Sequence, residues 1–255
     1  MTSMTVRLIG GPTALIEIGG LRLLTDPTFD PPGDHPVGSR TLVKTRGPVV
    51  PLDEIGPIDA VLLSHDQHPD NLDDGGRTLL GRVPLVLSTT DAEKRLGGRT
   101  TALPAWQDFS LARPGGRMLW VTGVPAQHGP DGTTDVTGEV TGFVLRADDL
   151  PTVYVSGDNA SLDLVGTIAD RVGTIDVALL FAGAARSPLL DANLTLDSDQ
   201  AARAAQRLDA GVVIPVHTEG WQHFTQGPDT IADAFARRGE QERLVLLGPG
   251  ESTTL

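Results

Sequence analysis

The feature that most constrains this chain is the position of its histidines at the ends of apolar, strand-like runs. Five of the six histidines fall in three such places: His65 with His68, then His128, then His217 with His223. A fourth run ends in Gly157-Asp158. Strand ends that meet at one edge of a sheet gather such side chains around one point, and imidazoles and carboxylates are ligands for divalent metals. The sequence therefore predicts a metal site built by strand ends.

Composition narrows the chemistry of that site. The 255 residues contain no cysteine, which excludes disulfides, thiolate ligands and a cysteine nucleophile. The remaining nitrogen and oxygen ligands suit zinc, manganese or iron. The formal net charge of −13 argues against a nucleic-acid partner. No apolar stretch of about 18 residues occurs and the N-terminus lacks a signal-like apolar core, so we expect no membrane span and a cytoplasmic protein.

Hydrophobic periodicity divides the chain into β and α segments. Strands are expected at 6–9, 14–18, 21–24, 58–63, 85–87, 116–122, 138–146, 152–156, 177–181, 212–216 and 244–247, and helices at 72–81, 90–96, 162–172, 198–208 and 230–237. The Pro/Gly-rich stretch 31–57 is interpreted as a long loop of the kind that borders binding sites. The order of elements looks like two similar halves. It predicts one domain over residues 1–255, with two packed sheets and helices outside.

One segment resembles a known signature. Ser64-His65-Asp66-Gln67-His68-Pro69-Asp70-Asn71-Leu72-Asp73 is similar to the His-x-His-x-Asp-His motif of the metallo-β-lactamase superfamily. His128, Gly157-Asp158 and His217 follow in the order that this superfamily uses, and Thr25-Asp26-Pro27 is also similar. The branch that the chain most resembles contains ascorbate-6-phosphate lactonase-like and N-acyl-phosphatidylethanolamine phospholipase D-like proteins. The resemblance covers essentially the whole chain and implies an α/β fold, the four-layer αββα sandwich of the metallo-β-lactamase fold.

By that resemblance, the site holds one or two divalent metal ions, zinc or manganese, with iron as an alternative. One ion takes the His-x-His pair plus His128, the other takes the Asp-His pair plus His217, and Asp158 bridges them. A metal-bound hydroxide attacks an ester, lactone, amide or phosphodiester of a small molecule. Asp70 orients this hydroxide or accepts its proton and is the expected catalytic residue.

The first motif departs from the superfamily pattern. Gln67 stands where the second histidine belongs, with His68 one residue later, and Asn71 stands where the final histidine belongs. His65 and His68 form the pair if the loop bulges; alternatively Gln67 binds through its carbonyl oxygen, or not at all. Gln and Asn are weaker ligands than imidazole for zinc. A mononuclear site and a site without metal are therefore open alternatives.

Three further residues have two interpretations each. Asp26 either starts a loop or orients a ligand histidine. Trp221 and His223, which closely follow His217, are candidate substrate contacts or ordinary loop packing. His35 lies in the Pro/Gly-rich stretch and is interpreted as a surface group.

The leading hypothesis is thus a metallo-hydrolase of a small molecule. The alternative is a non-catalytic binding or regulatory protein with a degraded metal site. Its signature would be Gln67 turned away, with only two histidines near any metal. A metal-dependent enzyme other than a hydrolase is a third hypothesis, because this fold also supports oxidoreductases. A homo-oligomer is compatible with all three.

Overall fold

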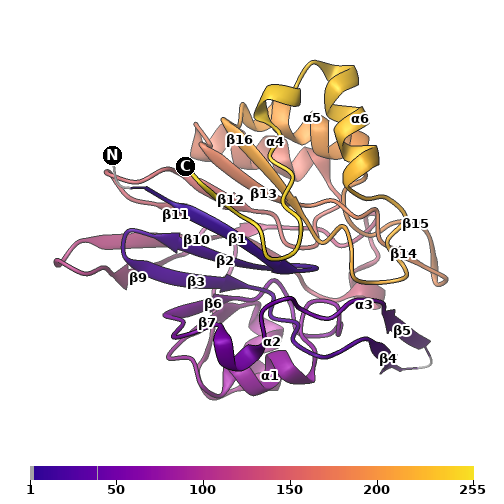
Figure 1. The fold of residues 1–255 in the computed structure, drawn as a ribbon, viewed down its shortest axis with the longest axis horizontal. Helices are drawn as coiled ribbons and strands as arrows, with labels where there is room; N and C mark the ends of the chain where they lie inside the picture. Colours follow the sequence, from indigo (N-terminus) through magenta and orange to yellow (C-terminus); the bar gives the residue numbers. More distant parts are fainter. Residues whose placement is uncertain (1–2, 39) are drawn as a thin grey trace.

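Two β-sheets face each other in the computed structural model of the chain, which describes residues 3–38 and 40–255 (Figure 1). The first sheet has the order β17-β1-β2-β3-β6-β7-β8, with β1 Thr5–Gly10, β2 Thr13–Ile18, β3 Leu21–Thr25, β6 Ala60–Leu62, β7 Val86–Ser88, β8 Thr100–Ala102 and β17 Ser252–Thr254. The second has the order β16-β13-β12-β11-β10-β9, with β9 Asp108–Ala112, β10 Met118–Pro125, β11 Thr141–Arg146, β12 Val153–Val155, β13 Val177–Phe181 and β16 Val212–Val216. Two hairpins lie outside the sheets, β4 (Gly33–Val37) with β5 (Arg40–Lys44) and β14 (Arg186–Ser187) with β15 (Leu190–Asn193).

Helices cover the outer faces of both sheets, which gives the four-layer αββα sandwich that the sequence predicts (Figure 1). On the side of the first sheet lie α1 (Asp74–Leu80) and α2 (Thr90–Leu96), and on the side of the second lie α4 (Leu162–Val172), α5 (Ser198–Leu208) and α6 (Pro228–Arg238). Short turns complete the set: α3 (Thr134–Thr137) and the 3-10 helices η1 (Leu52–Glu54) and η2 (Gln241–Arg243). None of the helices in the described ranges is long and apolar enough to cross a membrane.

Burial explains why the expected strands and helices form. Strand β13 is buried at all five positions, as its unbroken apolar sequence predicts for a strand covered on both faces. Its side chains serve two cores, since Leu179 packs between the sheets and Ala178 packs under α4–α6. Helices α4 and α5 begin at the expected residues because Ser161 and Asp197 cap them, and Asp197 forms a capping box with Gln200.

Two expectations about local structure are wrong, and several short strands were not expected. Residues 244–247 form no strand, since Leu244 makes only an isolated bridge with Val213, and the last strand is β17, which pairs with β1. The stretch 31–57 is not all loop, because it contains the β4–β5 hairpin. Strands β8, β9, β14 and β15 were not expected. Most of their side chains are polar or partly exposed, so pairing with neighbours, and not apolar patterning, defines these strands.

The topology brings several strand ends to one edge. Strands β3, β6 and β7 run parallel to one another, as do β12, β13 and β16, and β10 has the same direction as β12 because both are antiparallel to β11. Their carboxyl ends therefore meet at the edge of the sandwich beside the two hairpins, on the right of Figure 1.

Candidate metal centre

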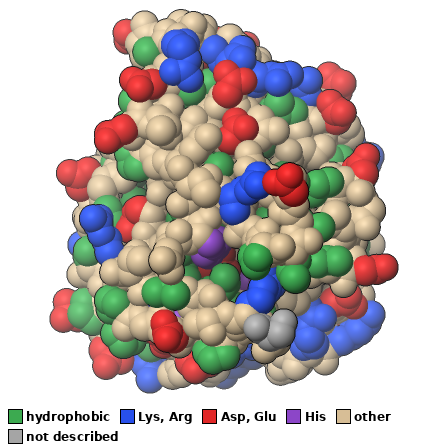
Figure 2. Space-filling view, turned by 90° about the vertical axis from the view of Figure 1, so that its right-hand side faces the viewer, with side chains coloured by type: hydrophobic (Ala, Val, Ile, Leu, Met, Phe, Trp, Pro, Cys, Tyr) green, Lys and Arg blue, Asp and Glu red, His purple; other side chains and the backbone are tan. Residues whose placement is uncertain are grey.

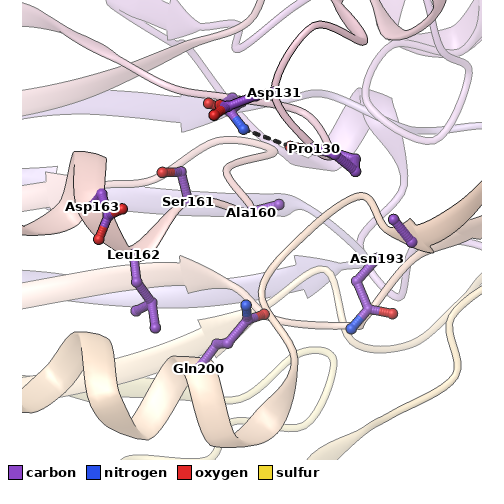
Figure 3. Close-up of a pocket in the computed structure, with 11 residues that line it drawn as sticks. Pro130, Asp131, Ala160, Ser161, Leu162, Asp163, Asn193 and Gln200 are labelled. Atoms are coloured by element: carbon purple, nitrogen blue, oxygen red, sulfur yellow. Dashed lines mark hydrogen bonds between the residues drawn. The ribbon is translucent and has the colours of Figure 1, made fainter.

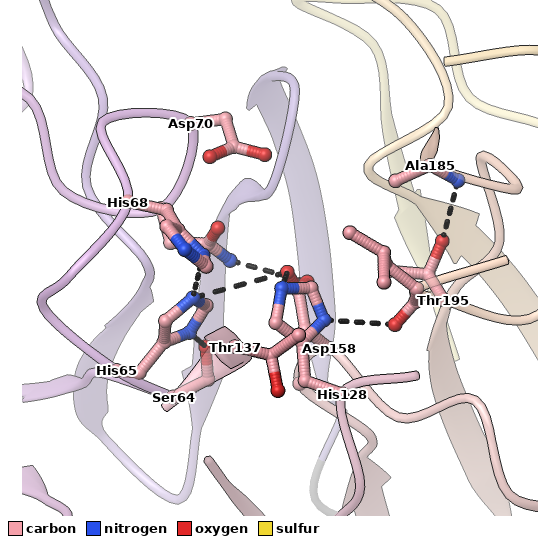
Figure 4. A network of polar contacts seen from close by, with 12 residues as sticks. Ser64, His65, His68, Asp70, His128, Thr137, Asp158, Ala185 and Thr195 are labelled. Atoms are coloured by element: carbon pink, nitrogen blue, oxygen red, sulfur yellow. Dashed lines mark hydrogen bonds and ion pairs between the residues drawn. The ribbon is translucent and has the colours of Figure 1, made fainter. Parts of the chain in front are cut away.

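Two adjacent groups of potential metal ligands lie at this edge (Figure 4). The first consists of His65, His68 and His128, and the second of Asp70, Asp158 and His217; within each group the ligand atoms lie within 4.8 Å of one another. Asp158 joins the groups, because its Oδ2 is 3.6 Å from His128 Nε2 and its Oδ1 is 3.0 Å from His217 Nδ1. The structure thus brings together all six residues that the sequence predicts as ligands. All are buried except His68, which is partly exposed.

The irregular loop after β6 explains how His68 reaches the site. Asp66 points away from the site and forms a bidentate ion pair with Arg95 of α2. The amide of Gln67 lies against Gly138, where a Cβ would collide with it. These two residues form the bulge, so His68 takes the position beside His65, with Nδ1 3.0 Å from His65 Nε2. The Gln67 side chain also lines a separate pocket, with His35, Pro69 and Arg77.

Hydrogen bonds orient the imidazoles. Asp26 accepts from the backbone N–H and the hydroxyl of Ser64, each at 2.6 Å, and Ser64 Oγ lies 3.0 Å from His65 Nδ1. Because the Ser64 hydroxyl donates to Asp26, it accepts from His65 Nδ1–H, which leaves the lone pair of Nε2 facing the site. His128 Nδ1 donates to the Leu194 carbonyl at 2.8 Å, with the same result for its Nε2. Asp26 is therefore placed to orient a candidate ligand.

Asn71 occupies a different role from the one that the motif suggests. Its Nδ2 donates to Asp26 Oδ2 at 3.0 Å and to Asp158 Oδ1 at 3.2 Å, so its amide links two buried carboxylates. Burial raises the pKa of Asp26 to about 7, although the bonds from Asn71 and Ser64 work in the opposite direction.

The charges of the two groups differ. Burial lowers the pKa of His65 well below its usual value and that of His68 to about 4, so both imidazoles are neutral at pH 7. Burial alone would also lower the pKa of His217, but Asp158 and Asp70 raise it to about 10. Burial would raise the pKa of Asp70, yet His223 and His217 hold it well below the usual value. The second group therefore favours a positive charge between two carboxylates.

Several buried polar atoms fit a cation at this place. Asp70 Oδ1, Asp158 Oδ2 and both ring nitrogens of His217 have no well-directed hydrogen bond to any described residue. Such atoms are costly to bury without a partner. Three imidazole nitrogens, two carboxylates and a fourth imidazole form the kind of donor set that divalent transition metals bind. The residues present therefore fit one or two metal ions.

The backbone fixes His217 in a strained conformation. Its φ is 57°, and its N–H donates to the carbonyl of Gly11 at 2.8 Å. Gly183 lies so close that a Cβ there would collide with the His217 carbonyl oxygen. A non-glycine residue in the left-handed region is uncommon and persists only where its surroundings hold it, so this turn positions the imidazole.

The mouth of the site lies between the two hairpins. Figure 2 shows histidine side chains in a hollow at the centre of this face, flanked by basic and hydrophobic side chains. The hollow is lined by Arg40, Leu42, His68, Asp70, His128, Ala185, Arg186, Ser187, Leu194 and His223. His223 also contacts Asp70, with 3.0 Å between Nε2 and Oδ2. Trp221, by contrast, is buried beside His35 and Lys44 and does not line the hollow.

The base of the β4–β5 hairpin is fixed by a buried ion pair. Lys44 Nζ, at the end of β5, lies 2.8 Å from Oδ2 of Asp73, the residue that caps α1. Both side chains are almost completely buried. Arg40, at the other end of β5, reaches across the mouth and donates to Ser187 Oγ of the second hairpin at 2.8 Å. Sequence patterns identified neither Arg40 nor Ser187, because no chemical motif surrounds them.

A separate pocket of about 420 Å³ lies between residues 129–131, which follow His128, and the first residues of α4 and α5 (Figure 3). Its lining includes Asp131, Asp163, Asn193 and Gln200 but no histidine. Both ligand groups found in the described part of the chain belong to the edge between the sheets. The chemistry expected from the sequence is therefore placed at the mouth between the hairpins and not in this pocket.

Comparisons with known proteins agree with the fold and the ligand groups. The family model described as "Beta-lactamase superfamily domain" matches residues 21–218. A UPF0173 metal-dependent hydrolase of Pyrococcus furiosus is 28% identical, over 98% of this chain and 99% of that protein. One from Methanosphaerula palustris is 30% identical, over 75% and 83%. The crystal structure of an isothiocyanate hydrolase from Delia radicum gut bacteria has a TM-score of 0.82 at 19% identity, with 98% of each chain covered, and shows the same fold. The chain belongs to the β-lactamase superfamily and has the metallo-β-lactamase fold.

Proposed function

We propose that this protein is a metal-dependent hydrolase of a small molecule, with its metal centre at the mouth between the hairpins. The observation that carries the proposal is the pair of ligand groups joined by Asp158. The superfamily assignment and relatives named as metal-dependent hydrolases support it. Water is added across an ester, lactone, amide or phosphodiester bond. The hydroxyl goes to the carbonyl carbon or the phosphorus, and the proton goes to the leaving oxygen or nitrogen, which stays in the same molecule when the substrate is a lactone.

In this proposal His65, His68 and His128 would hold one ion, and Asp70, Asp158 and His217 would hold a second. A bound divalent ion would supply Lewis acidity and lower the pKa of a water molecule beside it. Asn71 donates to carboxylates where the superfamily motif has an imidazole, so we expect the second position to bind metal more weakly than the first.

Asp70 is the proposed catalytic residue. It is buried and ionised, and its Oδ1 has no donor among the described residues, while Oδ2 contacts His217 and His223. A carboxylate with one free oxygen can orient an attacking water and accept its proton. The contacts of Oδ2 keep the free oxygen in a fixed direction.

The degraded-site alternative predicted that Gln67 turns away and that only two histidines remain near a metal. Gln67 does turn away, but His68 takes its place and completes a group of three imidazoles. This geometry favours the hydrolase over a non-catalytic protein. Zinc or manganese as the native metal, and a cytoplasmic location, stay predictions.

Metal analysis and hydrolysis test the proposal together. We expect protein purified without chelator to contain Zn, Mn or Fe near one equivalent or more, and metal addition to raise its Tm. Metal-loaded protein should hydrolyse at least one class among p-nitrophenyl esters, lactones and bis(p-nitrophenyl) phosphate, and His65→Ala should abolish this. Absence of all three metals, together with no Tm gain on metal addition, would refute the proposal.

A further inference from the structure

Two arginines from distant parts of the chain line the mouth of the metal centre. Arg40 lies on β5 and Arg186 on β14, and both line the same hollow as His68, Asp70 and His128. The hollow itself is small, about 20 Å³, and the hydrogen bond from Arg40 to Ser187 crosses it. Two arginine side chains therefore line the hollow that opens onto His68, Asp70 and His128.

The charge of Arg40 is not neutralised by the protein. Ser187 is its side-chain hydrogen-bond partner, and no carboxylate of the described residues forms an ion pair with it. Arg186 pairs with Asp191 at 2.7 Å, but the Asp191 side chain is fully exposed, and such pairs are weak. Asp70 is the carboxylate that lines the hollow, and it contacts His217 and His223, so the side of the mouth at Arg40 is positive in a chain with a net charge of −13. The positive potential of Arg40 and Arg186 attracts an anion to this part of the hollow.

The remaining lining is largely apolar. Leu42, Ala185 and Leu194 contribute hydrocarbon surface beside the two guanidinium groups. A neutral serine hydroxyl is a partner that an oxyanion can displace, because an oxyanion adds an opposite charge and can accept two parallel bonds from the guanidinium group. The chemistry of this lining matches a ligand with one anionic end and a short organic body. Such a ligand enters only when Arg40 leaves Ser187, because the hollow of about 20 Å³ has room for little more than one water molecule.

We propose that the substrate is a small organic anion whose carboxylate, or another terminal oxyanion, binds Arg40, with Arg186 as the second cation. This inference rests on the proposed hydrolase function. The anionic end displaces the Ser187 hydroxyl from Arg40. The organic body lies on Leu42 and Leu194, and the bond to be cleaved reaches the side of the hollow that holds Asp70 and His128.

Binding of a non-reactive anion tests the inference without hydrolysis. The probes are benzenesulfonate, a weak metal ligand, and methyl phenyl sulfone, its neutral counterpart, titrated into the full-length metal-loaded protein and followed by ligand-observed NMR. We expect the wild type to prefer the sulfonate, and Arg40→Gln to weaken sulfonate binding about tenfold, as for the loss of one charge-assisted bond. Arg46→Gln is the matched control, because Arg46 is an exposed arginine two residues beyond β5 and outside the hollow, so its loss should leave the preference unchanged.

Two further variants keep the test decisive. Arg40→Lys keeps the positive charge but loses the planar donor geometry of the guanidinium group. Its affinity for the sulfonate should fall between those of wild type and Arg40→Gln. Asp191→Asn releases Arg186 and should strengthen sulfonate binding slightly. Equal affinity of wild type for the two probes, or an unchanged preference in a folded Arg40→Gln protein, would overturn the inference.

Hydrolysis provides a separate readout. Mono(p-nitrophenyl) glutarate carries a terminal carboxylate, and p-nitrophenyl pentanoate is its neutral match. The ratio of kcat/KM for the two esters should fall about tenfold in Arg40→Gln, mostly through KM, and should be unchanged in Arg46→Gln. If the protein hydrolyses no substrate of any class but prefers the sulfonate through Arg40, the proposed function fails while the anion site stands. If hydrolysis occurs without preference for the anionic ester, the anion site fails alone.

Discussion

The two ligand groups of the metal centre are adjacent, yet they are built differently. The first offers three imidazoles, and burial keeps His65 and His68 neutral. The second offers two carboxylates and His217, whose pKa Asp158 and Asp70 raise to about 10 against the effect of burial. A cation at the first group would be held by nitrogen lone pairs, whereas one at the second would also be held by charge.

One position of the motif adds to this difference. An imidazole at position 71 would have added a nitrogen ligand to the second group, but Asn71 donates hydrogen bonds to Asp26 and Asp158 instead. The second group thereby keeps its carboxylates in place without an ion, and it has one ligand fewer to offer when an ion binds. Four substitutions separate these contributions, from the largest expected effect to the smallest.

Asp158→Asn should remove the connection between the groups. Asp158 contacts both His128 and His217, so its neutralisation weakens both metal positions. We expect the metal content to drop to near zero and kcat/KM to fall by more than about 100-fold. This exceeds the loss of up to about 100-fold that follows the removal of a residue that only orients a ligand. Elemental analysis and hydrolysis assays measure this. Asp170→Asn, on the exposed face of α4, is the control, and full metal retention by Asp158→Asn would contradict the bridging role.

Asn71→Asp should destabilise the metal-free protein. The change removes two donated bonds and places a third carboxylate beside Asp26 and Asp158, all of them buried. An uncompensated buried charge costs about 3–5 kcal/mol, which lowers Tm by roughly 10 °C in a chain of this size. Calorimetry with and without metal should show a larger metal-induced Tm gain than in wild type. An unchanged metal-free Tm would mean that Asn71 does not link the carboxylates.

His223→Ala should affect only the second group. His223 Nε2 contacts Asp70 Oδ2, so its loss frees Asp70 to rotate. We expect about tenfold weaker binding at the second position and an unchanged first position, in the range for residues that orient ligands. A titration with a competing chelator resolves the two sites. His35→Ala removes a histidine that packs on Trp221 outside the hollow and should change neither.

Gln67→Ala should change metal affinity least, by less than about twofold, because its amide lies against Gly138 and its side chain lines a separate pocket. His68→Ala, one residue away, should weaken the first position strongly. The same chelator titration compares the two variants. A tenfold loss in Gln67→Ala would show that the loop after β6 rearranges when metal binds.

The sequence predicted the ends of β12 and β16 to within one residue because an unbroken apolar run stops where the polar ligands begin, with Asp158 and His217 just beyond. The strand before His128 was expected to end at 122, whereas β10 continues to Pro125 through the polar and small residues Thr122 and Gly123. The caps Ser161 and Asp197 set the starts of α4 and α5. The αββα architecture followed from the superfamily resemblance. A single domain over residues 1–255 stays a prediction.

Other parts of the site depend on contacts between distant residues. The bulge that brings His68 to His65 is held by the ion pair of Asp66 with Arg95, 29 positions along the chain. The carbonyl that orients His128 comes from Leu194, in a segment with no motif. The hairpins over the mouth are short and partly exposed, so they leave no apolar alternation to detect.

The buried pair of Lys44 with Asp73 has a mechanical consequence for the arm that carries Arg40. One end of β5 is anchored in the protein interior, while the other is held across the mouth by a single bond to Ser187. The hairpin is thus firmly attached at one end only. We expect amide exchange to be slow near Lys44 and faster toward Arg40. We expect substitutions near Arg40 to change substrate choice and to leave the candidate ligands in place, because the ligands follow other strands.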